Sequence, residues 1–231
     1  MNSLIFLAAG EGRRVGAGKN KMLISVKGKP LVWYSLKHVL QSTELDEIIL
    51  VTQEKERPEF EEVVRSFHTQ IPFIFANGGR TRSESVRNGL NRVSAASDKV
   101  LIHDGARPFL DEEIIKRNIQ AVREYQACVA GMPSKDTVKI VDENDFAVNT
   151  PERRFVWCIQ TPQVFETALI RHAYFKLMEN EENETGITDD AMVVERMENC
   201  AVKLVEGSYE NIKITTPEDL ILAESLIKKR N

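Results

Sequence analysis

Apolar and polar positions follow one another along the chain in a pattern that predicts alternating strands and helices. Short apolar runs predict buried strands at 4–8, 48–51, 73–75, 100–102 and 128–130. Apolar residues at helical spacing predict helices between them, at 30–40, 58–67, 83–93 and 111–122. This order implies an α/β fold with a mainly parallel sheet and helices on both of its faces. Ligands of such sheets bind at the carboxyl ends of the strands, where the loops gather.

The alternation breaks between residues 134 and 160. Residues 137–141 alternate like an exposed strand, 142–145 predict a turn, and 155–159 predict a returning strand. We therefore expect a β-hairpin arm that projects from the sheet. Because an isolated two-stranded hairpin is marginally stable in water, a second subunit is the simplest packing partner. The alternative is a hairpin folded onto its own domain.

The regular pattern resumes after the arm. It predicts helices at 166–179 and 189–197, strands at 202–205 and 212–214, and a last helix that begins at Thr216 and Pro217. No repeat, low-complexity tract or linker rich in proline and glycine divides the chain. We expect residues 1–231 to form one domain, with 134–160 inserted in it as an arm for dimerisation.

Composition narrows the range of functions. The net charge of -4 and the pI near 5.7 argue against a nucleic-acid partner held by bulk positive charge. No apolar stretch approaches the length of a membrane span, so no membrane partner is expected. The three cysteines show no spacing typical of a zinc site and fit free thiols in a reducing compartment. A soluble, cytoplasmic protein is predicted.

The loop after the first strand combines small residues with positive charge. Its glycines and alanines leave backbone N–H groups able to cradle phosphate oxygens. Arg13, Arg14, Lys19 and Lys21 add positive charge to the same loop. Position 13 is not the glycine that a P-loop needs, and Val15 stands where the dinucleotide-binding fingerprint needs glycine. The loop is therefore interpreted as a phosphate loop of another type, with a plain surface loop as the alternative.

Further polar clusters follow later strands. Asp104 can hold Mg²⁺ or a ribose hydroxyl, and Arg107 can pair with a phosphate or orient the acid. A capping Asp with a surface Arg is the alternative. His103 is expected to be a structural hydrogen-bonding residue rather than a base. Residues 78–85 offer a Gly-Gly pair for close backbone approach, and Ser85 and the backbone can read the edge of a base. Lys213 can aim at an anion, or can be an ordinary surface lysine.

Taken together, these clusters resemble the motifs of the cytidylyltransferases that make sugar-alcohol nucleotides. The resemblance covers essentially the whole chain and is carried, in order, by LAAGEGRRVGAGKNKML, GGRTRSESV, HDGARPF, KDTVK, QTPQVF, TDDA and EGSYENIKITTPEDL. It is strongest to the family that acts on 2-C-methyl-D-erythritol 4-phosphate in the non-mevalonate route to isoprenoids. Such a resemblance implies a Rossmann-like three-layer sandwich and transfer of CMP from CTP to that acceptor, with release of pyrophosphate. A ribitol-5-phosphate cytidylyltransferase and a catalytically silent nucleotide-binding regulator are the alternatives.

The resemblance also implies roles at matching positions. The expected catalytic residues are Arg14, Lys21 and Lys213. The expected CTP-binding residues are Ala8, Ala9, Gly10, Gly12, Gly79, Ser85, Asp104 and Gly105. The expected residues for the sugar phosphate are Arg107, Thr137, Arg153, Thr161, Thr188, Glu210 and Lys213. Asp104 is also the expected ligand of Mg²⁺ or another divalent cation. Thr137 and Arg153 would reach from the arm into the partner's site in a homodimer.

Three positions depart from the family pattern. Asn20 precedes Lys21 where the resemblance leads us to expect proline. Arg80 stands where an acidic residue is common, and Glu210 stands where aspartate is expected. The charge of Lys21 is unaffected by its neighbour, so we expect the variation at position 20 to be tolerated. The contacts of the Arg80 side chain are not predicted.

Overall fold

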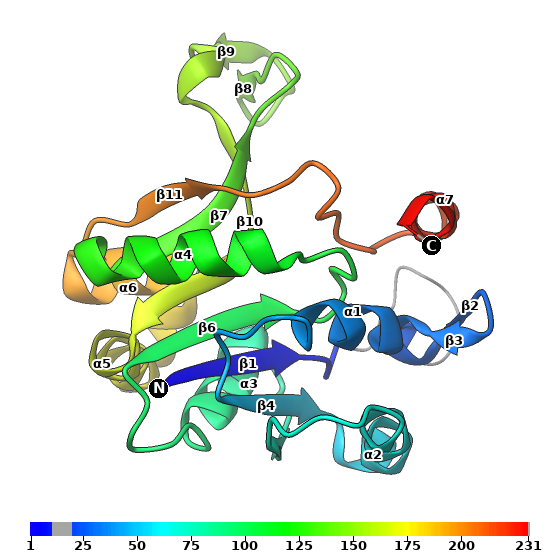
Figure 1. Cartoon of the computed structure of the whole chain (residues 1–231). Helices are drawn as coiled ribbons and strands as arrows, with labels where there is room; N and C mark the ends of the chain where they lie inside the picture. Colours follow the sequence, from blue (N-terminus) through cyan, green and yellow to red (C-terminus); the bar gives the residue numbers. More distant parts are fainter. Residues whose placement is uncertain (11–19, 231) are drawn as a thin grey trace.

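The computed structural model describes residues 1–10 and 20–230 and is built on one seven-stranded sheet (Figure 1). In spatial order its strands are β11 (Lys203–Glu206), β7 (Ala127–Pro133), β10 (Trp157–Glu166), β6 (Lys99–Asp104), β1 (Asn2–Leu7), β4 (Glu47–Thr52) and β5 (Phe73–Asn77). The pairs β1–β4, β1–β6, β4–β5 and β7–β11 are parallel, whereas β10 runs antiparallel to both of its neighbours. The predicted mainly parallel sheet is confirmed.

Helices cover both faces of this sheet. One face packs on α1 (Leu31–Val39), α2 (Arg57–Arg65), α4 (Glu112–Tyr125) and α7 (Pro217–Arg230). The other packs on α3 (Arg82–Leu90), α5 (Thr167–Met178) and α6 (Asp190–Glu198). Successive side chains of a strand point to opposite faces, so Leu4 and Phe6 join the first core and Ile5 joins the second. This arrangement is the predicted three-layer α/β sandwich.

The predicted position at which the arm returns to the sheet was wrong. Residues 157–159, assigned to the returning strand of the arm, pair with β7 and open the long strand β10. The rest of β10 was not predicted as a strand at all. It contains Gln160, Thr161 and Gln163, which are buried although polar, and the register of its pairing with β7 shifts between Ile159 and Gln163. The apolar run that marks a buried strand is therefore missing.

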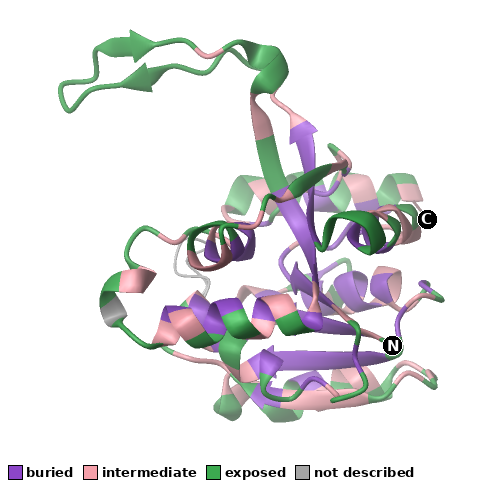
Figure 2. Cartoon of the chain, turned by 90° about the vertical axis from the view of Figure 1, so that its left-hand side faces the viewer, coloured by how far each residue is buried: buried purple, intermediate pink, exposed green. Residues whose placement is uncertain are grey.

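The arm itself is a shorter hairpin than predicted. β8 (Ile140–Val141) pairs antiparallel with β9 (Ala147–Asn149). The predicted turn at 142–145 is present, because the Asp142 carboxylate accepts hydrogen bonds from the backbone N–H groups of Asn144 and Phe146. The hairpin projects from the body of the molecule and is exposed along its length (Figures 1 and 2).

Residues 212–214 are not a strand, contrary to the prediction. This segment crosses the carboxyl end of the sheet and is tied there by a backbone hydrogen bond from Ile214 to Ala106 (2.8 Å). The Asn211 side chain donates a second bond to the Thr161 carbonyl (2.8 Å). A crossing segment of this kind cannot follow the sheet ladder, although its apolar residues Ile212 and Ile214 pack against the core.

The remaining elements are short. They are the strands β2 (Ser25–Val26) and β3 (Lys29–Pro30) and the 3₁₀ helices η2 (Lys21–Leu23), η3 (Glu54–Glu56), η4 (Arg153–Phe155) and η5 (Glu181–Glu184). Within the described ranges, no helix is both long enough and apolar enough to cross a membrane.

Candidate active site

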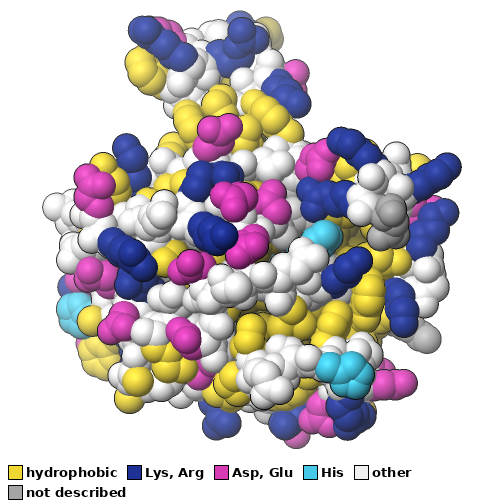
Figure 3. Space-filling model, in the orientation of Figure 1, with side chains coloured by type: hydrophobic (Ala, Val, Ile, Leu, Met, Phe, Trp, Pro, Cys, Tyr) yellow, Lys and Arg dark blue, Asp and Glu magenta, His cyan; other side chains and the backbone are white. Residues whose placement is uncertain are grey.

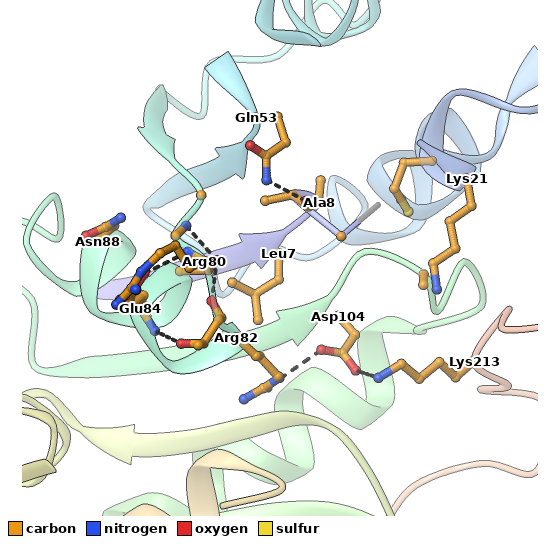
Figure 4. A pocket seen from close by; sticks show the side chains of 18 residues that line it. Leu7, Ala8, Lys21, Gln53, Arg80, Arg82, Glu84, Asn88, Asp104 and Lys213 are labelled. Carbon is orange, nitrogen blue, oxygen red and sulfur yellow. Dashed lines mark hydrogen bonds and ion pairs between the residues drawn. The ribbon is translucent and has the colours of Figure 1, made fainter. Parts of the chain in front are cut away.

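A pocket of about 940 Å³ opens at the carboxyl ends of β1, β4, β5 and β6 (Figure 4). From β1 the strand order runs outward to β4 and β5 on one side and to β6 on the other. Ligands of open α/β sheets bind at such a reversal of strand order. The walls come from the loops after these strands, from the start of α3, and from Lys21 and Lys213. The fold thus places the pocket where the sequence predicted ligands to bind.

The end of β1 forms one wall of the pocket. Ala8, Ala9 and Gly10 line it with backbone and small side chains. The Gln53 side chain donates to the Ala9 carbonyl (2.9 Å) and fixes the path of the chain. Gly78 at the end of β5 packs so closely that a Cβ atom there would collide with the Ala9 side chain. This wall of the pocket is therefore formed by backbone groups and small side chains.

The start of α3 forms the adjoining wall. The Gly79 N–H donates to Ser85 Oγ (2.9 Å), and a side chain at position 79 would collide with Glu84. Thr81 caps the helix by accepting from the Glu84 N–H (3.0 Å). Arg80 pairs with the Glu84 carboxylate (2.9 Å). The arginine that departs from the family pattern is therefore directed at the neighbouring turn of α3.

Asp104 is the centre of charge in the pocket. Its carboxylate contacts Lys213 Nζ at 2.7 Å and Arg82 Nη2 at 3.6 Å, from opposite sides (Figure 4). Burial alone would raise the pKa of Asp104, but the positive charges of Arg82 and Lys213 outweigh it and hold that pKa well below its usual range. Asp104 is consequently ionised at neutral pH.

His103 and Thr161 lie behind Asp104 and orient it. The Asp104 N–H donates to Thr161 Oγ1 (3.1 Å), which also shares a hydrogen bond with His103 Nδ1 (2.9 Å). The other ring nitrogen faces the Arg107 carbonyl (3.2 Å). Burial lowers the pKa of His103 to about 4, so the ring is neutral at pH 7. His103 makes the hydrogen bonds predicted for it, and Thr161 is engaged in the same network, so that a role of Thr161 toward a substrate stays a prediction.

Gly105 and Arg107 make their contacts within the protein. A Cβ atom at Gly105 would collide with the Phe6 ring and approach the Leu7 carbonyl. Arg107 donates to the Asn211 carbonyl (2.7 Å) and so holds the segment that carries Lys213. Among the described residues that line the pocket, neither of these two is found. Their direct contact with a ligand stays a prediction.

Lys21 reaches the pocket from η2 (Figure 4). Its Nζ donates to the Ile214 carbonyl (2.8 Å), one residue from Lys213. The buried Asn20 fixes the approach: its side-chain amide donates to the Ala8 carbonyl (2.8 Å) and to Glu56 (2.7 Å). The departure at position 20 therefore supplies an anchor between η2 and β1. Gly12 and Arg14, predicted in this loop, lie outside the described residues.

Four predicted residues lie away from the pocket walls. Thr137 and Arg153 are exposed on the arm, and Arg153 donates to the Lys135 carbonyl (3.3 Å). Thr188 is exposed just before α6. Glu210 forms ion pairs with Lys229 (2.7 Å) and Arg230 (2.9 Å) of α7, so in this structure it anchors the last helix. Their roles toward a substrate stay predictions.

The structure adds a pair of residues that sequence reasoning missed. Arg82 lines the pocket and forms a two-fold ion pair with Asp190, through bonds of 2.9 and 2.7 Å. Both residues stand in motifs that carried the resemblance, GGRTRSESV and TDDA. The two motifs offered a signal that charged groups matter there. The local sequence around each residue gives no sign that Arg82 and Asp190, which are 108 positions apart, form a pair.

Comparison with known proteins agrees with this geometry. The sequence profile of one family, 2-C-methyl-D-erythritol 4-phosphate cytidylyltransferase, matches residues 3–229. Proteins of that name from Caldanaerobacter subterraneus subsp. tengcongensis and Lachnospira eligens are 46% and 45% identical to this chain. These alignments cover 98% and 99% of this chain, and 99% and 100% of the relatives.

Solved structures give the same result. The 4-diphosphocytidyl-2C-methyl-D-erythritol synthase of Anaerococcus prevotii superposes with a TM-score of 0.88 at 35% identity, over 99% of this chain and 96% of that one. The 2-C-methyl-D-erythritol 4-phosphate cytidylyltransferase of Thermus thermophilus superposes with a TM-score of 0.76 at 28% identity, over 98% of each chain.

The environment of His103 predicts a specific dependence of stability on pH. A histidine whose pKa falls from 6.5 to about 4 on folding binds fewer protons in the folded state between these values. The free energy of unfolding should therefore fall as the pH drops through this window, by up to about 3 kcal/mol. Its ring signals in NMR spectra should stay those of a neutral imidazole down to about pH 5.

Urea unfolding of the wild type and of a His103→Gln variant at several pH values checks this. The variant has no titrating ring at position 103, so its stability should change less between pH 6.5 and pH 4. A protonated His103 ring at pH 6 in the folded protein would contradict the account.

Proposed function

The chain belongs to the 2-C-methyl-D-erythritol 4-phosphate cytidylyltransferase family, and from this premise we propose that it is a nucleotidyltransferase of that specificity. It transfers CMP from CTP to 2-C-methyl-D-erythritol 4-phosphate and gives 4-diphosphocytidyl-2-C-methyl-D-erythritol and pyrophosphate, a step in isoprenoid precursor synthesis. The observation that carries the proposal is the family match along nearly the whole chain. The pocket that collects Lys21, Asp104 and Lys213 supports it.

The reaction depends on stabilising negative charge rather than on transferring a proton. An oxygen of the acceptor phosphate forms a bond to the α-phosphorus of CTP, and the bond from that phosphorus to the pyrophosphate oxygen breaks. The attacking phosphate is already a nucleophile, so no general base is required. The barrier comes from bringing two anions together, which positioning and fixed positive charges lower. Lys21 and Lys213 are cations of the described pocket that can act in this way, with Arg14 as the expected third.

We propose that the cytosine and ribose occupy the part of the pocket lined by backbone groups and small side chains. We propose that Ala8, Ala9 and Gly10 on one wall, and Gly79 and Ser85 on the other, contact the base. Polar backbone groups at fixed positions can distinguish the edge of one base from another. The triphosphate would then extend toward Lys21, one of the cations that line the pocket.

The donor set of the pocket fits a metal that arrives with its nucleotide. Within the described residues there is no group of three His, Cys, Asp or Glu side chains that could enclose a metal ion. Mg²⁺ is commonly held by one or two carboxylates together with substrate phosphates. We propose that Asp104 is the protein ligand of Mg²⁺ or another divalent cation. When bound, the metal would neutralise charge on the triphosphate and favour departure of pyrophosphate.

The arm supports a proposal of a homodimer. Phe146 and Phe155 are each 72% exposed and Val148 is 61% exposed. Apolar side chains also gather where the arm joins the body of the molecule (Figure 3). A hairpin with such a surface gains stability by packing on another subunit. We propose that each arm lies on the second copy and delivers Thr137 and Arg153 to the sugar phosphate bound there.

Location and the remaining partners are inferred from the chemistry. Cys128, Cys158 and Cys200 are free thiols, which suits a reducing compartment. We therefore propose that the enzyme acts in the cytoplasm, where CTP is available. The acidic net charge of -4 gives no support to a nucleic-acid partner.

A pyrophosphate-release assay tests the proposed function directly. The wild type should release pyrophosphate with CTP and 2-C-methyl-D-erythritol 4-phosphate, and much less with ribitol 5-phosphate or with the other three nucleoside triphosphates. Lys21→Ala should lower kcat roughly 10²- to 10³-fold, the scale for losing one preorganised charge contact. Lys116→Ala is a matched control, since that lysine pairs with Glu112 on the surface of α4.

Release of pyrophosphate only with ribitol 5-phosphate would establish the alternative acceptor. Failure with every acceptor tested would favour the silent regulator. A Lys21→Ala enzyme with normal kcat would remove Lys21 from the mechanism.

The arm offers a second test, with neighbouring arginines as a matched pair. Arg153→Ala should raise KM for the sugar phosphate roughly 10- to 100-fold, the scale of one hydrogen bond to a charged group, and should change KM for CTP far less. Arg154→Ala should change neither, because Arg154 pairs with Glu152 at 2.8 Å. Steady-state kinetics give the KM values for the sugar phosphate and for CTP. Sedimentation shows whether the active protein is a dimer. Equal effects of Arg153→Ala on the two KM values, or a fully active monomer, would count against the arm assignment.

A further inference from the structure

Behind the pocket lies a fully buried carboxylate that the proposed chemistry does not use. Asp190 is the first residue of α6 and is 0% exposed. Its two oxygens accept bonds of 2.9 and 2.7 Å from the two terminal nitrogens of Arg82. The Tyr174 hydroxyl of α5 donates a third bond, of 2.6 Å. A carboxylate so deeply buried is tolerated only when it is paired and hydrogen-bonded in this way.

The Arg82 guanidinium stands between two carboxylates. It faces Asp190 in the two-fold geometry, and the same Nη2 is 3.6 Å from Asp104 (Figure 4). The charges of Asp190 and Asp104 raise the pKa of Arg82 well above its ordinary value against the opposing effect of burial. Arg82 is thus a permanent cation, and its position depends on how the two anions share it.

Asp190 is itself held in place on two sides. Tyr174 is 2% exposed, and its ring packs in the core between the sheet, α3 and α6. The start of α6 is tied to β10, because Gln163 donates to Asp189 (2.9 Å) and accepts from the Ala191 N–H (2.9 Å). The Asp190 carboxylate therefore cannot follow Arg82 into the pocket.

We propose that Asp190 and Tyr174 form a positioning pair that holds Arg82 against the pocket wall and so keeps the Asp104 carboxylate open to the nucleotide. This inference rests on the proposed function of the pocket as the CTP site. Without the charge of Asp190, the nearest remaining carboxylate for Arg82 is Asp104, which already contacts Lys213 on its other side. A full ion pair there would cover both oxygens of Asp104 and withdraw them from the ligand.

Binding of CTP and Mg²⁺, measured by calorimetry without an acceptor, tests the inference. Asp190→Asn keeps the shape of the side chain and removes its charge, and it should weaken CTP binding roughly 10- to 100-fold, within the range of couplings between contacting residues. Tyr174→Phe is milder and should weaken binding several-fold, about the effect of one hydrogen bond. It keeps the test valid if Asp190→Asn does not fold.

A control separates positioning from general destabilisation. Glu47 is a comparably buried carboxylate, 3% exposed, that accepts bonds from Ser3 Oγ (2.6 Å) and the Ser94 N–H (2.8 Å). It is the first residue of β4 and lies at the amino ends of the strands, whereas the pocket lies at their carboxyl ends. Glu47→Gln should lower the melting temperature and leave CTP affinity unchanged.

A double-mutant cycle identifies the residue through which Asp190 acts. In an Arg82→Met background, Asp190→Asn should cause no further loss of CTP affinity, because no cation is left to close on Asp104. A loss that persists in that background, or normal CTP affinity in both Asp190→Asn and Tyr174→Phe, would overturn the inference. Wild-type protein that does not bind CTP would overturn the proposed function and this inference with it. Binding of CTP without turnover of the acceptor would overturn the proposed function but not the inference about Asp190.

Discussion

The organisation of the site depends on one carboxylate held between two cations. Asp104 ends β6, and Lys213 and Arg82 reach it from opposite directions, at 2.7 and 3.6 Å. Their charges overcome the cost of burying an anion and keep it ionised. Lys213 comes from the segment that crosses the sheet, and Arg82 comes from the start of α3. The ion cluster therefore joins parts of the chain that are distant in sequence and defines the charged end of the pocket.

The rest of the pocket follows from how a parallel sheet ends. Strands β1, β4, β5 and β6 are neighbours, and their carboxyl ends lie on the same side of the sheet. Small residues after these ends let the loops approach one another closely. Ala8 to Gly10 and Gly79 line the pocket together with Lys21, Arg80, Arg82 and Lys213. His103 and Thr161 support Asp104 from behind through hydrogen bonds, and a reaction whose nucleophile is already an anion needs no base from them. Fold, charge and chemistry are consistent at this edge.

Much of this architecture could be predicted because buried parallel strands are continuous apolar runs and their helices repeat at regular spacing. Residues 160–166 of β10 escaped prediction because Gln160, Thr161 and Gln163 are buried polar residues, satisfied by partners far along the chain such as Ser208 and Asp189. The pairing of Arg82 with Asp190 was equally hidden. Local pattern identifies charged residues, whereas only the packing of α3 against α5 and α6 decides which of them meet. The motifs behind the family resemblance located the pocket, but they did not indicate which of their residues support others.

The most direct test of the account is a crystal structure of the protein with CTP and Mg²⁺. The base should lie between the end of β1 and the Gly79–Ser85 turn, and the triphosphate should extend toward Lys21. Asp104 should then contact the ribose or the metal, with Arg82 still paired to Asp190. CTP bound outside this pocket, or bound with no contact to either Lys21 or Asp104, would contradict it.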